Sequence, residues 1–169
     1  LEPTTEQSNV APYQMEIQKS VESALYVADG ISIGEKYYVE GGLRYSLFTL
    51  MGPATVNTYE PGVPKSTSTQ IGEVTYGSGE KVQSYSGLEP RLSLRFNVNP
   101  NSSIKAGYNR IYQYLHLVSN TTAITPVDVW QPSNTYFKPQ VADQVSIGFF
   151  KNFKEKMYEA FAEVYYKKI

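Results

Sequence analysis

The chain carries a single histidine, His116, and no cysteine. Paired-histidine metal sites and thiolate chemistry are therefore excluded, and a Ser-His-Asp catalytic arrangement would have to use this one residue. His116 stands between an alternating segment and a long irregular one, so we interpret it as a surface histidine. The sequence predicts no enzyme, no metal site and no cofactor.

The remaining candidates for acid–base chemistry are two carboxylates, Glu159 and Glu163. They lie four residues apart in a segment with strand-like alternation, which places them roughly 13 Å apart on one face. Both glycosidase mechanisms need a shorter separation. We interpret the two residues as salt-bridge partners on a polar face.

Two further groups of side chains could bind a ligand. Flat aromatic rings stack on sugars and chelates, but the same rings can also pack loops together, and both interpretations stay open. Arginines on a polar face could contact a second polar domain or a polar solute. The aromatic candidates are Tyr114, His116, Trp130, Tyr136 and Phe137, and the arginines are Arg44, Arg91 and Arg95.

Hydrophobic alternation with a period of two predicts the elements that position these residues. Segments 17–28 and 155–164 also fit a helical face, but their Tyr-rich endings and the neighbouring strands favour sheet. We therefore predict an all-β chain with six antiparallel up-and-down strands, at residues 20–33, 36–50, 86–98, 102–115, 141–153 and 157–166.

The connections alternate strictly between short and long. Short turns are predicted at 34–35, 99–102 and 152–156, and long loops at about 51–84 and 117–139, the first with a short hairpin near residues 74–76. An up-and-down sheet places all short turns at one end, which is typical of outer-membrane barrels. The apolar face would then contact lipid, with tyrosines near the strand ends at Tyr37, Tyr45, Tyr108, Tyr112, Tyr158 and Tyr166.

Charge and hydropathy narrow the alternatives. The chain has 15 Lys and Arg against 16 Asp and Glu, so its net charge of −1 favours no nucleic-acid partner. No segment approaches the roughly 20 apolar residues of a membrane helix, whereas a membrane strand needs only about 9–11. Because the chain begins LEPTTEQ and ends VYYKKI, we expect a piece of a longer protein.

The segments LEPRLSLRFNVNPNSSIKAGYNR and KPQVADQVSIGFF resemble the β-barrel of TonB-dependent receptors of Bacteroidetes-type bacteria, and GGLRYSLFTLMGPATVNTYEPGVPK is similar to a barrel hairpin with its extracellular loop in the same group. The resemblance extends from about Ser20 to the end. It implies that residues 1–169 form about six strands of a 22-stranded transmembrane β-barrel, with the plug domain outside this sequence.

The resemblance also implies a function. Such a receptor would import a scarce solute, namely an iron chelate, a vitamin or an oligosaccharide, across the outer membrane. Its partners would be its own plug domain, the TonB complex and outer-membrane lipid, with a surface lipoprotein left open. A passive porin, a barrel adhesin and a soluble β-barrel binding module remain alternatives. The side chains expected to face the lumen and plug are Arg44, Arg91, Arg95, Glu159 and Glu163.

Overall fold

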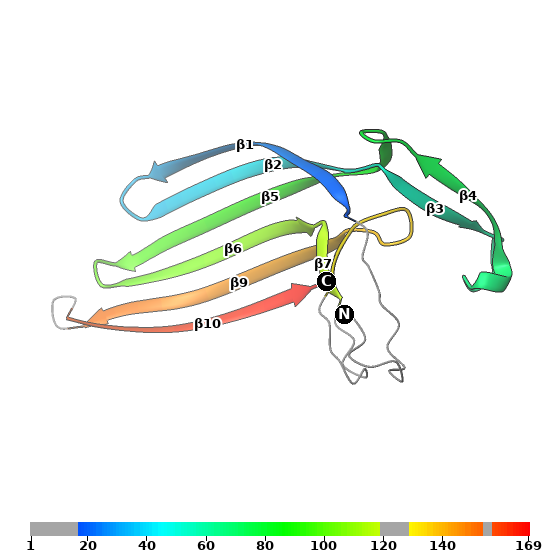
Figure 1. The fold of residues 1–169 in the computed structure, drawn as a ribbon. Helices are drawn as coiled ribbons and strands as arrows, with labels where there is room; N and C mark the ends of the chain where they lie inside the picture. The colour runs from blue at the N-terminus through cyan, green and yellow to red at the C-terminus, as the bar shows by residue number, and fades with distance from the viewer. Residues whose placement is uncertain (1–16, 119–128, 154–156) are drawn as a thin grey trace, which may run out of the picture.

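The computed structural model describes residues 17–118, 129–153 and 157–169. Six long strands form one antiparallel sheet in the order β1-β2-β5-β6-β9-β10 (Figure 1). The predicted up-and-down arrangement is confirmed, as an open sheet, and the helical alternatives for the first and last strands are wrong. The strands are β1 (Lys19–Ile33), β2 (Tyr37–Met51), β5 (Lys81–Asn99), β6 (Ser102–Gln113), β9 (Gln140–Phe153) and β10 (Tyr158–Lys168).

The two tight turns that the structure describes, between β1 and β2 and between β5 and β6, lie at one end of the sheet, which we call the turn end. Gly34 there adopts a positive φ of 62°, which glycine tolerates without steric cost. In the Asn-Pro-Asn turn, the side-chain oxygen of Asn99 accepts a hydrogen bond from the Asn101 amide at 3.0 Å. Such a side chain mimics a backbone turn, which explains why β5 reverses directly into β6.

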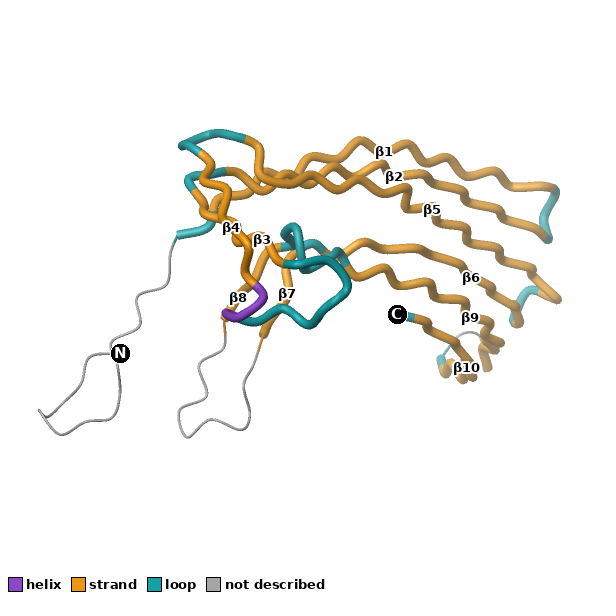
Figure 2. Tube along the Cα trace, turned by 90° about the vertical axis from the view of Figure 1, so that its right-hand side faces the viewer, coloured by secondary structure: helices purple, strands orange, loops and turns teal. Residues whose placement is uncertain are grey.

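The opposite end, which we call the loop end, carries two additional hairpins (Figure 2). One joins β3 (Ala54–Tyr59) to β4 (Gln70–Tyr76), with a short 3-10 helix at Thr67–Thr69 between them. The other pairs β7 (Leu115–Val118) with β8 (Val129–Pro132). The short hairpin expected near residues 74–76 exists but is much larger, and β5 begins before the predicted residue 86. Part of the segment 117–139, residues 119–128, lies outside the described residues, as does most of the last turn.

A small hydrophobic core lies at the loop end. It consists of four buried side chains, Phe48, Leu50, Val82 and Tyr114. The rings of Phe48 and Tyr114 stack at 5.1 Å between centroids. Most other large apolar side chains of the long strands are exposed, so the described sheet has no core of its own below the loop end.

Tyr112 departs from the expected position on the lipid-facing side. Its ring lies so close to Gly87 that a Cβ at that glycine would meet ring atoms at 2.5 Å. Gly87 shares its face with Ser46, directly opposite on β2. Tyr112 therefore packs towards the opposite face, stacked near Tyr114 at 6.3 Å, and the prediction for this residue was wrong.

No helix in the described part of the chain is long and apolar enough to span a membrane.

Candidate functional site

One face of the sheet, the apolar face, runs across all six long strands. The register places Tyr45 of β2 opposite Leu88 of β5, and Leu92 of β5 opposite Tyr108 of β6. Most of its large apolar side chains on β1, β2, β5, β9 and β10 are solvent-exposed, from 41% for Leu94 to 79% for Leu25, whereas those on β6, Tyr108 included, are only partly exposed. Further members of this face are Val21, Val27, Ile31, Tyr37, Leu43, Leu47, Val98, Val145, Ile147, Phe149, Val164 and Tyr166.

Charged residues on the apolar face of β9 mark its two limits. Asp143 lies near the loop end and Lys151 near the turn end, separated by roughly 26 Å of strand. A strand tilted by about 40° would convert this into roughly 20 Å across the sheet, close to the apolar band of outer-membrane barrels, about 25 Å tall. The Lys151 ammonium lies 5.1 Å from the Phe153 ring centroid, towards the turn end, as expected for a lysine that keeps its charge out of hydrocarbon.

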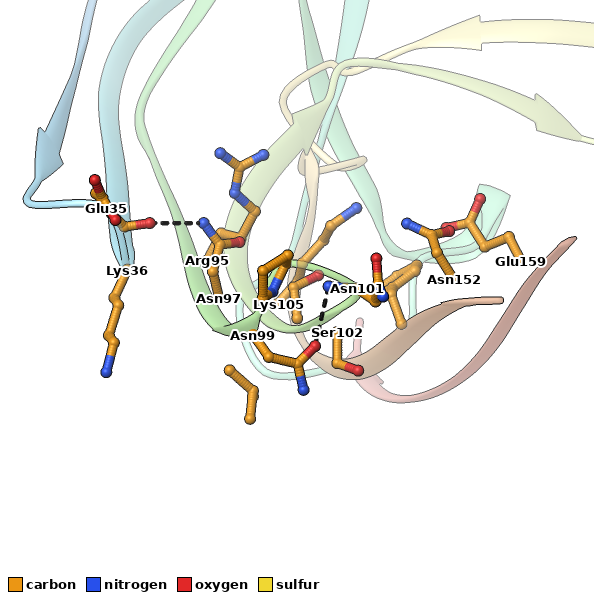
Figure 3. Close-up of a pocket in the computed structure, with 14 residues that line it drawn as sticks. Glu35, Lys36, Arg95, Asn97, Asn99, Asn101, Ser102, Lys105, Asn152 and Glu159 are labelled. Atoms are coloured by element: carbon orange, nitrogen blue, oxygen red, sulfur yellow. Dashed lines mark hydrogen bonds between the residues drawn. The ribbon is translucent and has the colours of Figure 1, made fainter. Parts of the chain in front are cut away.

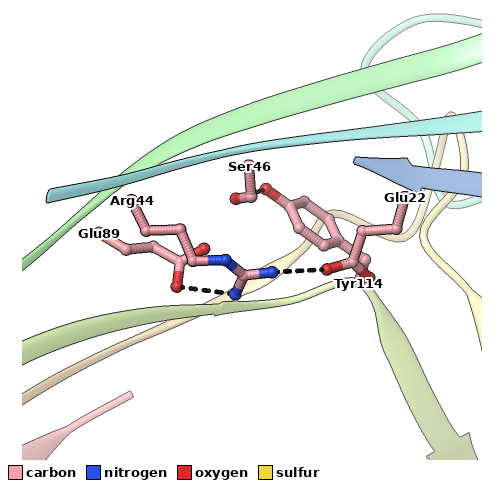
Figure 4. Close-up of polar contacts among 5 residues, drawn as sticks. All are labelled: Glu22, Arg44, Ser46, Glu89 and Tyr114. Carbon is pink, nitrogen blue, oxygen red and sulfur yellow. Dashed lines mark hydrogen bonds and ion pairs between the residues drawn. The ribbon is translucent and has the colours of Figure 1, made fainter. Parts of the chain in front are cut away.

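The opposite face, the polar face, contains a charge cluster that joins three strands (Figure 4). Arg44 of β2 contacts Glu22 of β1 and Glu89 of β5, each with an N–O distance of 3.4 Å. Glu89 is fully buried, and its Oε1 atom has no hydrogen-bond partner among the described residues. A buried carboxylate depends strongly on its countercharge, so Arg44 is the residue that makes the burial of Glu89 tolerable.

The cluster is covered from the loop end by Tyr114. The Tyr114 hydroxyl and the Ser46 hydroxyl are 2.8 Å apart and share a hydrogen bond. Because Ser46 and Tyr114 are both buried, this bond satisfies two polar groups that would otherwise be costly to bury. The sequence placed Arg44 on the polar face but did not predict that Glu22 and Glu89 would both pair with it.

The other predicted lumen-facing residues also lie on the polar face. The register places Arg91 opposite Gly42 and Arg95 opposite Tyr38, and the Arg95 guanidinium lies 5.4 Å from the centre of the Tyr38 ring. Glu163 is opposite Gly148, and Glu159 is opposite Asn152. The placement agrees with the predicted face, and the expected contact with a plug stays a prediction.

A polar cavity of about 550 Å³ opens on this face at the turn end (Figure 3). Arg95 and Lys105 contribute positive charge to its lining, and Glu159 contributes negative charge. The Asn97 amide closes one side by donating a hydrogen bond to the Glu35 carbonyl at 3.1 Å. A surface of mixed charge and amides suits contact with another polar protein surface better than with an apolar ligand.

Two of the five aromatic candidates for ligand binding are buried, and the other three, Trp130, Tyr136 and Phe137, are exposed. Tyr114 is 3% exposed and His116 is 4% exposed. The His116 Nε2 atom lies 3.2 Å from the Ser133 hydroxyl, and its ring packs edge-on against Phe137 at 5.0 Å. The interpretation of His116 as a surface histidine is wrong, because the segment after β8 folds over it. Tyr114 and His116 hold the loops together and offer no free ring face.

Trp130 and Tyr136 are exposed at the loop end. Trp130, on β8, is 61% exposed, and Tyr136 is 42% exposed. The Tyr136 hydroxyl donates a hydrogen bond to the Asn57 carbonyl, and the Lys65 ammonium lies 4.0 Å from the ring centroid. Tyr136 also lines a cavity of about 240 Å³ between β3 and the segment after β8, so it connects the two loop regions.

Burial makes His116 a pH-sensitive support of the loop end. Desolvation lowers the pKa of the imidazole from its usual 6.5, so the opened β7–β8 hairpin binds a proton more readily than the closed one. Neutral His116 therefore contributes its whole stabilisation of the closed β7–β8 hairpin above about pH 6.5, and this contribution decreases as the pH falls below that value. We expect amide protection factors in β7 and β8 of the complete protein to decrease between about pH 7.5 and pH 5.

The His116→Gln variant is the control for this measurement, because glutamine does not titrate in the range. Hydrogen exchange followed by mass spectrometry, corrected for intrinsic exchange rates, should show no comparable decrease in the variant. Equal pH dependence in both proteins would show that another group is responsible.

Within the described ranges, no cluster of three or more His, Cys, Asp or Glu side chains could hold a metal ion. The site therefore consists of surfaces: an apolar face bounded by charges, a polar face with a charge cluster, and an aromatic loop end.

Comparison with known proteins agrees with these surfaces. The chain matches the family described as TonB dependent receptor-like, beta-barrel, over residues 2–169. No curated protein and no solved structure matches it. The family comprises transporters and receptors, not enzymes, is characteristic of the outer membrane, and in general works with a plug domain and TonB. The apolar face and the polar face are the two sides that a barrel wall requires. This chain belongs to the TonB dependent receptor-like β-barrel family.

Proposed function

We propose that the chain is part of the barrel of an outer-membrane receptor that imports a scarce solute into the periplasm: an iron chelate, a vitamin or an oligosaccharide. The observation that carries the proposal is the apolar face of the sheet, which crosses six strands, is exposed on five of them (β1, β2, β5, β9 and β10), and is bounded by Asp143 and Lys151 on β9. Family membership supplies the transport class, and the lumen of such a barrel is polar.

The loop end is the extracellular side in this proposal. Long loops at about 51–84 and 117–139 would meet the solute first, and their exposed aromatic side chains include Trp130, Tyr136 and Phe137. The turn end would face the periplasm. The polar face would contact the receptor's plug domain through Arg44, Arg91, Arg95, Glu159 and Glu163, while the TonB complex would supply energy and a surface lipoprotein could cover the loops.

An uptake experiment tests this function. Cells with and without the complete receptor are offered a radiolabelled ferric hydroxamate chelate, cyanocobalamin or a malto-oligosaccharide. We expect receptor-dependent accumulation of one of the three, and we expect a protonophore to stop it, because transport through TonB needs an energised inner membrane. Receptor-dependent accumulation that continues in the protonophore would favour a passive porin. No receptor-dependent accumulation would contradict import of these three solute classes.

A second prediction concerns Trp130. In the complete receptor, the Trp130→Ala variant should bind the accumulated solute about five- to tenfold more weakly, because one aromatic stacking contact contributes about 1 kcal/mol. Isothermal titration with the purified receptor measures the affinity. The matched control is Leu117→Ala, since Leu117 is directly opposite on β7 and is itself 49% exposed. Unchanged affinity in Trp130→Ala would remove this residue from the binding surface.

A further inference from the structure

A row of three charged residues crosses the apolar face near the loop end. Arg110 of β6 is directly opposite Asp143 of β9, and Asp143 is directly opposite Lys168 of β10. The next row towards the turn end on the same face contains Tyr108, Val145 and Tyr166. The charged row therefore borders the apolar band and lies outside the polar face.

The exposure of neighbouring residues and the strand register show from which face of the sheet the charged side chains project. Val145 is 53% exposed, whereas Gln144 and Ser146, which project from the other face of β9, are only partly exposed, so this face of β9 is the outer one. The register then places Tyr166 and Lys168 of β10 on the same face. Tyr108 reaches upward from its own row, and its hydroxyl donates a hydrogen bond to Asp143 Oδ1 at 2.7 Å. Tyr108 and Asp143 therefore project from the same side of the sheet.

The three charges are not fully compensated. Arg110 binds Asp143 through two hydrogen bonds, from Nε to Oδ1 at 2.8 Å and from Nη2 to Oδ2 at 2.9 Å. Both carboxylate oxygens are thus engaged by one guanidinium, while the Nη1 group of Arg110 makes no hydrogen bond within the described chain. Lys168 is exposed and forms no ion pair with any described residue. The row carries a net charge of +1.

We propose that this row binds the phosphate group of an anionic lipid in the leaflet at the loop end. Arg110 and Lys168 stand two strand spacings apart, roughly 10 Å between backbones, and their long side chains can reach one phosphate between them. Guanidinium and ammonium groups are the side-chain groups that most often donate hydrogen bonds to phosphate in proteins. Asp143 holds the guanidinium in position and leaves Nη1 for the lipid.

The position of the row decides between a lipid and a free phosphate. A free anion would gain nothing from the apolar surface below the row, whereas the acyl chains of a lipid would cover Tyr108, Val145 and Tyr166. The turn end lacks a comparable arrangement on β9, because Lys151 there lies opposite Ser102 and Ala160. The site is therefore specific to the leaflet at the loop end.

The test uses the complete receptor in nanodiscs and compares dioleoyl phosphatidic acid with dioleoylglycerol, which differ only in the phosphate. Native mass spectrometry measures how much of each lipid stays bound. We expect phosphatidic acid to be retained in preference. The Lys168→Ala variant should reduce its retention about fivefold, as expected for one lysine near a lipid phosphate. The double variant Arg110→Gln/Asp143→Asn, which removes the pair without leaving an unpaired charge, should reduce it similarly.

The matched control is Lys167→Ala. Lys167 is the adjacent residue, but it is opposite Gln144 and projects from the other face, so retention should not change. Equal retention of the two lipids would overturn the proposal, as would equal effects of Lys168→Ala and Lys167→Ala. Displacement of phosphatidic acid by excess inorganic phosphate would also overturn it, because the site would then be one for a free anion.

Discussion

The Leu94→Arg form of the complete receptor should fail to accumulate as a folded barrel in the outer membrane. Leu94 lies in the middle of the apolar face, opposite Val39 on β2 and Ala106 on β6, and is 41% exposed. Ala106 is in turn opposite Ile147, midway between Asp143 and Lys151 on β9. An arginine on the lipid-facing side of a barrel at mid-membrane depth costs about 2–4 kcal/mol. Urea titration in lipid vesicles measures the folding free energy, and heat-modifiable mobility on gels measures the folded fraction in isolated membranes.

The matched control is Ser93→Arg, at the preceding residue of β5. Ser93 faces the polar side, where Glu40 is directly opposite on β2, so the new guanidinium can remain hydrated beside a carboxylate. We expect its folding free energy to change by less than about 1 kcal/mol. If the two variants were equally stable, or if Ser93→Arg were the more damaging, the assignment of the apolar face to lipid would be wrong.

Failure of Leu94→Arg to fold in the outer membrane would also count against a soluble binding module. In a soluble module the apolar face would need a protein cover, but the buried hydrophobic residues of the described chain are confined to the loop end. The sheet below that core exposes Leu94, Ile147 and Val164 among many others. Exposed apolar area on this scale marks an interaction surface in a folded protein, and in the proposed receptor lipid would cover all six strands at once.

The alternation of apolar and polar residues was sufficient to predict the six strands and their faces. In β5 the residues Leu92, Leu94 and Phe96 alternate with Arg91, Ser93 and Arg95, and a side-chain period of two leaves no other assignment once the strand exists. The tight Asn-Pro-Asn turn then fixes how β5 pairs with β6. The strands of the sheet and their faces therefore follow from local sequence features, namely alternation and turn residues.

The loop end could not be predicted in the same way, because its contacts join segments distant in sequence. The burial of His116 depends on Ser133 and Phe137, which follow a segment without clear periodicity. Similarly, Tyr112 continues the apolar alternation of β6, yet it turns towards the opposite face, where Gly87 has no side chain. A space left by a glycine on a neighbouring strand is invisible in the local pattern.

The charge cluster of Glu22, Arg44 and Glu89 could be predicted only in part. The faces of Glu22, Arg44 and Glu89 follow from alternation, but their contact requires the exact register across β1, β2 and β5. Within that register Arg44 is directly opposite Glu89, whereas Glu22 lies four residues along β1 from Tyr26, the residue opposite Arg44. The sequence pattern did not reveal that Glu89 is buried. This burial distinguishes the cluster from an ordinary exposed ion pair.

For that reason, Arg44→Met should destabilise the complete receptor by about 2–3 kcal/mol. Breaking a fully buried ion pair costs about 3–5 kcal/mol because one charge is left without a partner. The smaller value reflects the geometry here: the Arg44 side chain is 33% exposed, and its contact with Glu89 is 3.4 Å long. Methionine retains most of the packing volume. Urea titration in lipid vesicles gives the difference in free energy from the native receptor.

The double variant Arg44→Met/Glu89→Gln tests whether the unpaired carboxylate is the cause. If it is, removing the charge of Glu89 should recover at least about half of the loss, since a neutral amide costs much less to bury than an ion. The equivalent double variant Arg44→Met/Glu22→Gln should recover little, because Glu22 is 49% exposed and water already solvates it. Equal recovery in the two double variants would show that Arg44 stabilises the sheet through packing, and that the buried position of Glu89 has no special electrostatic role.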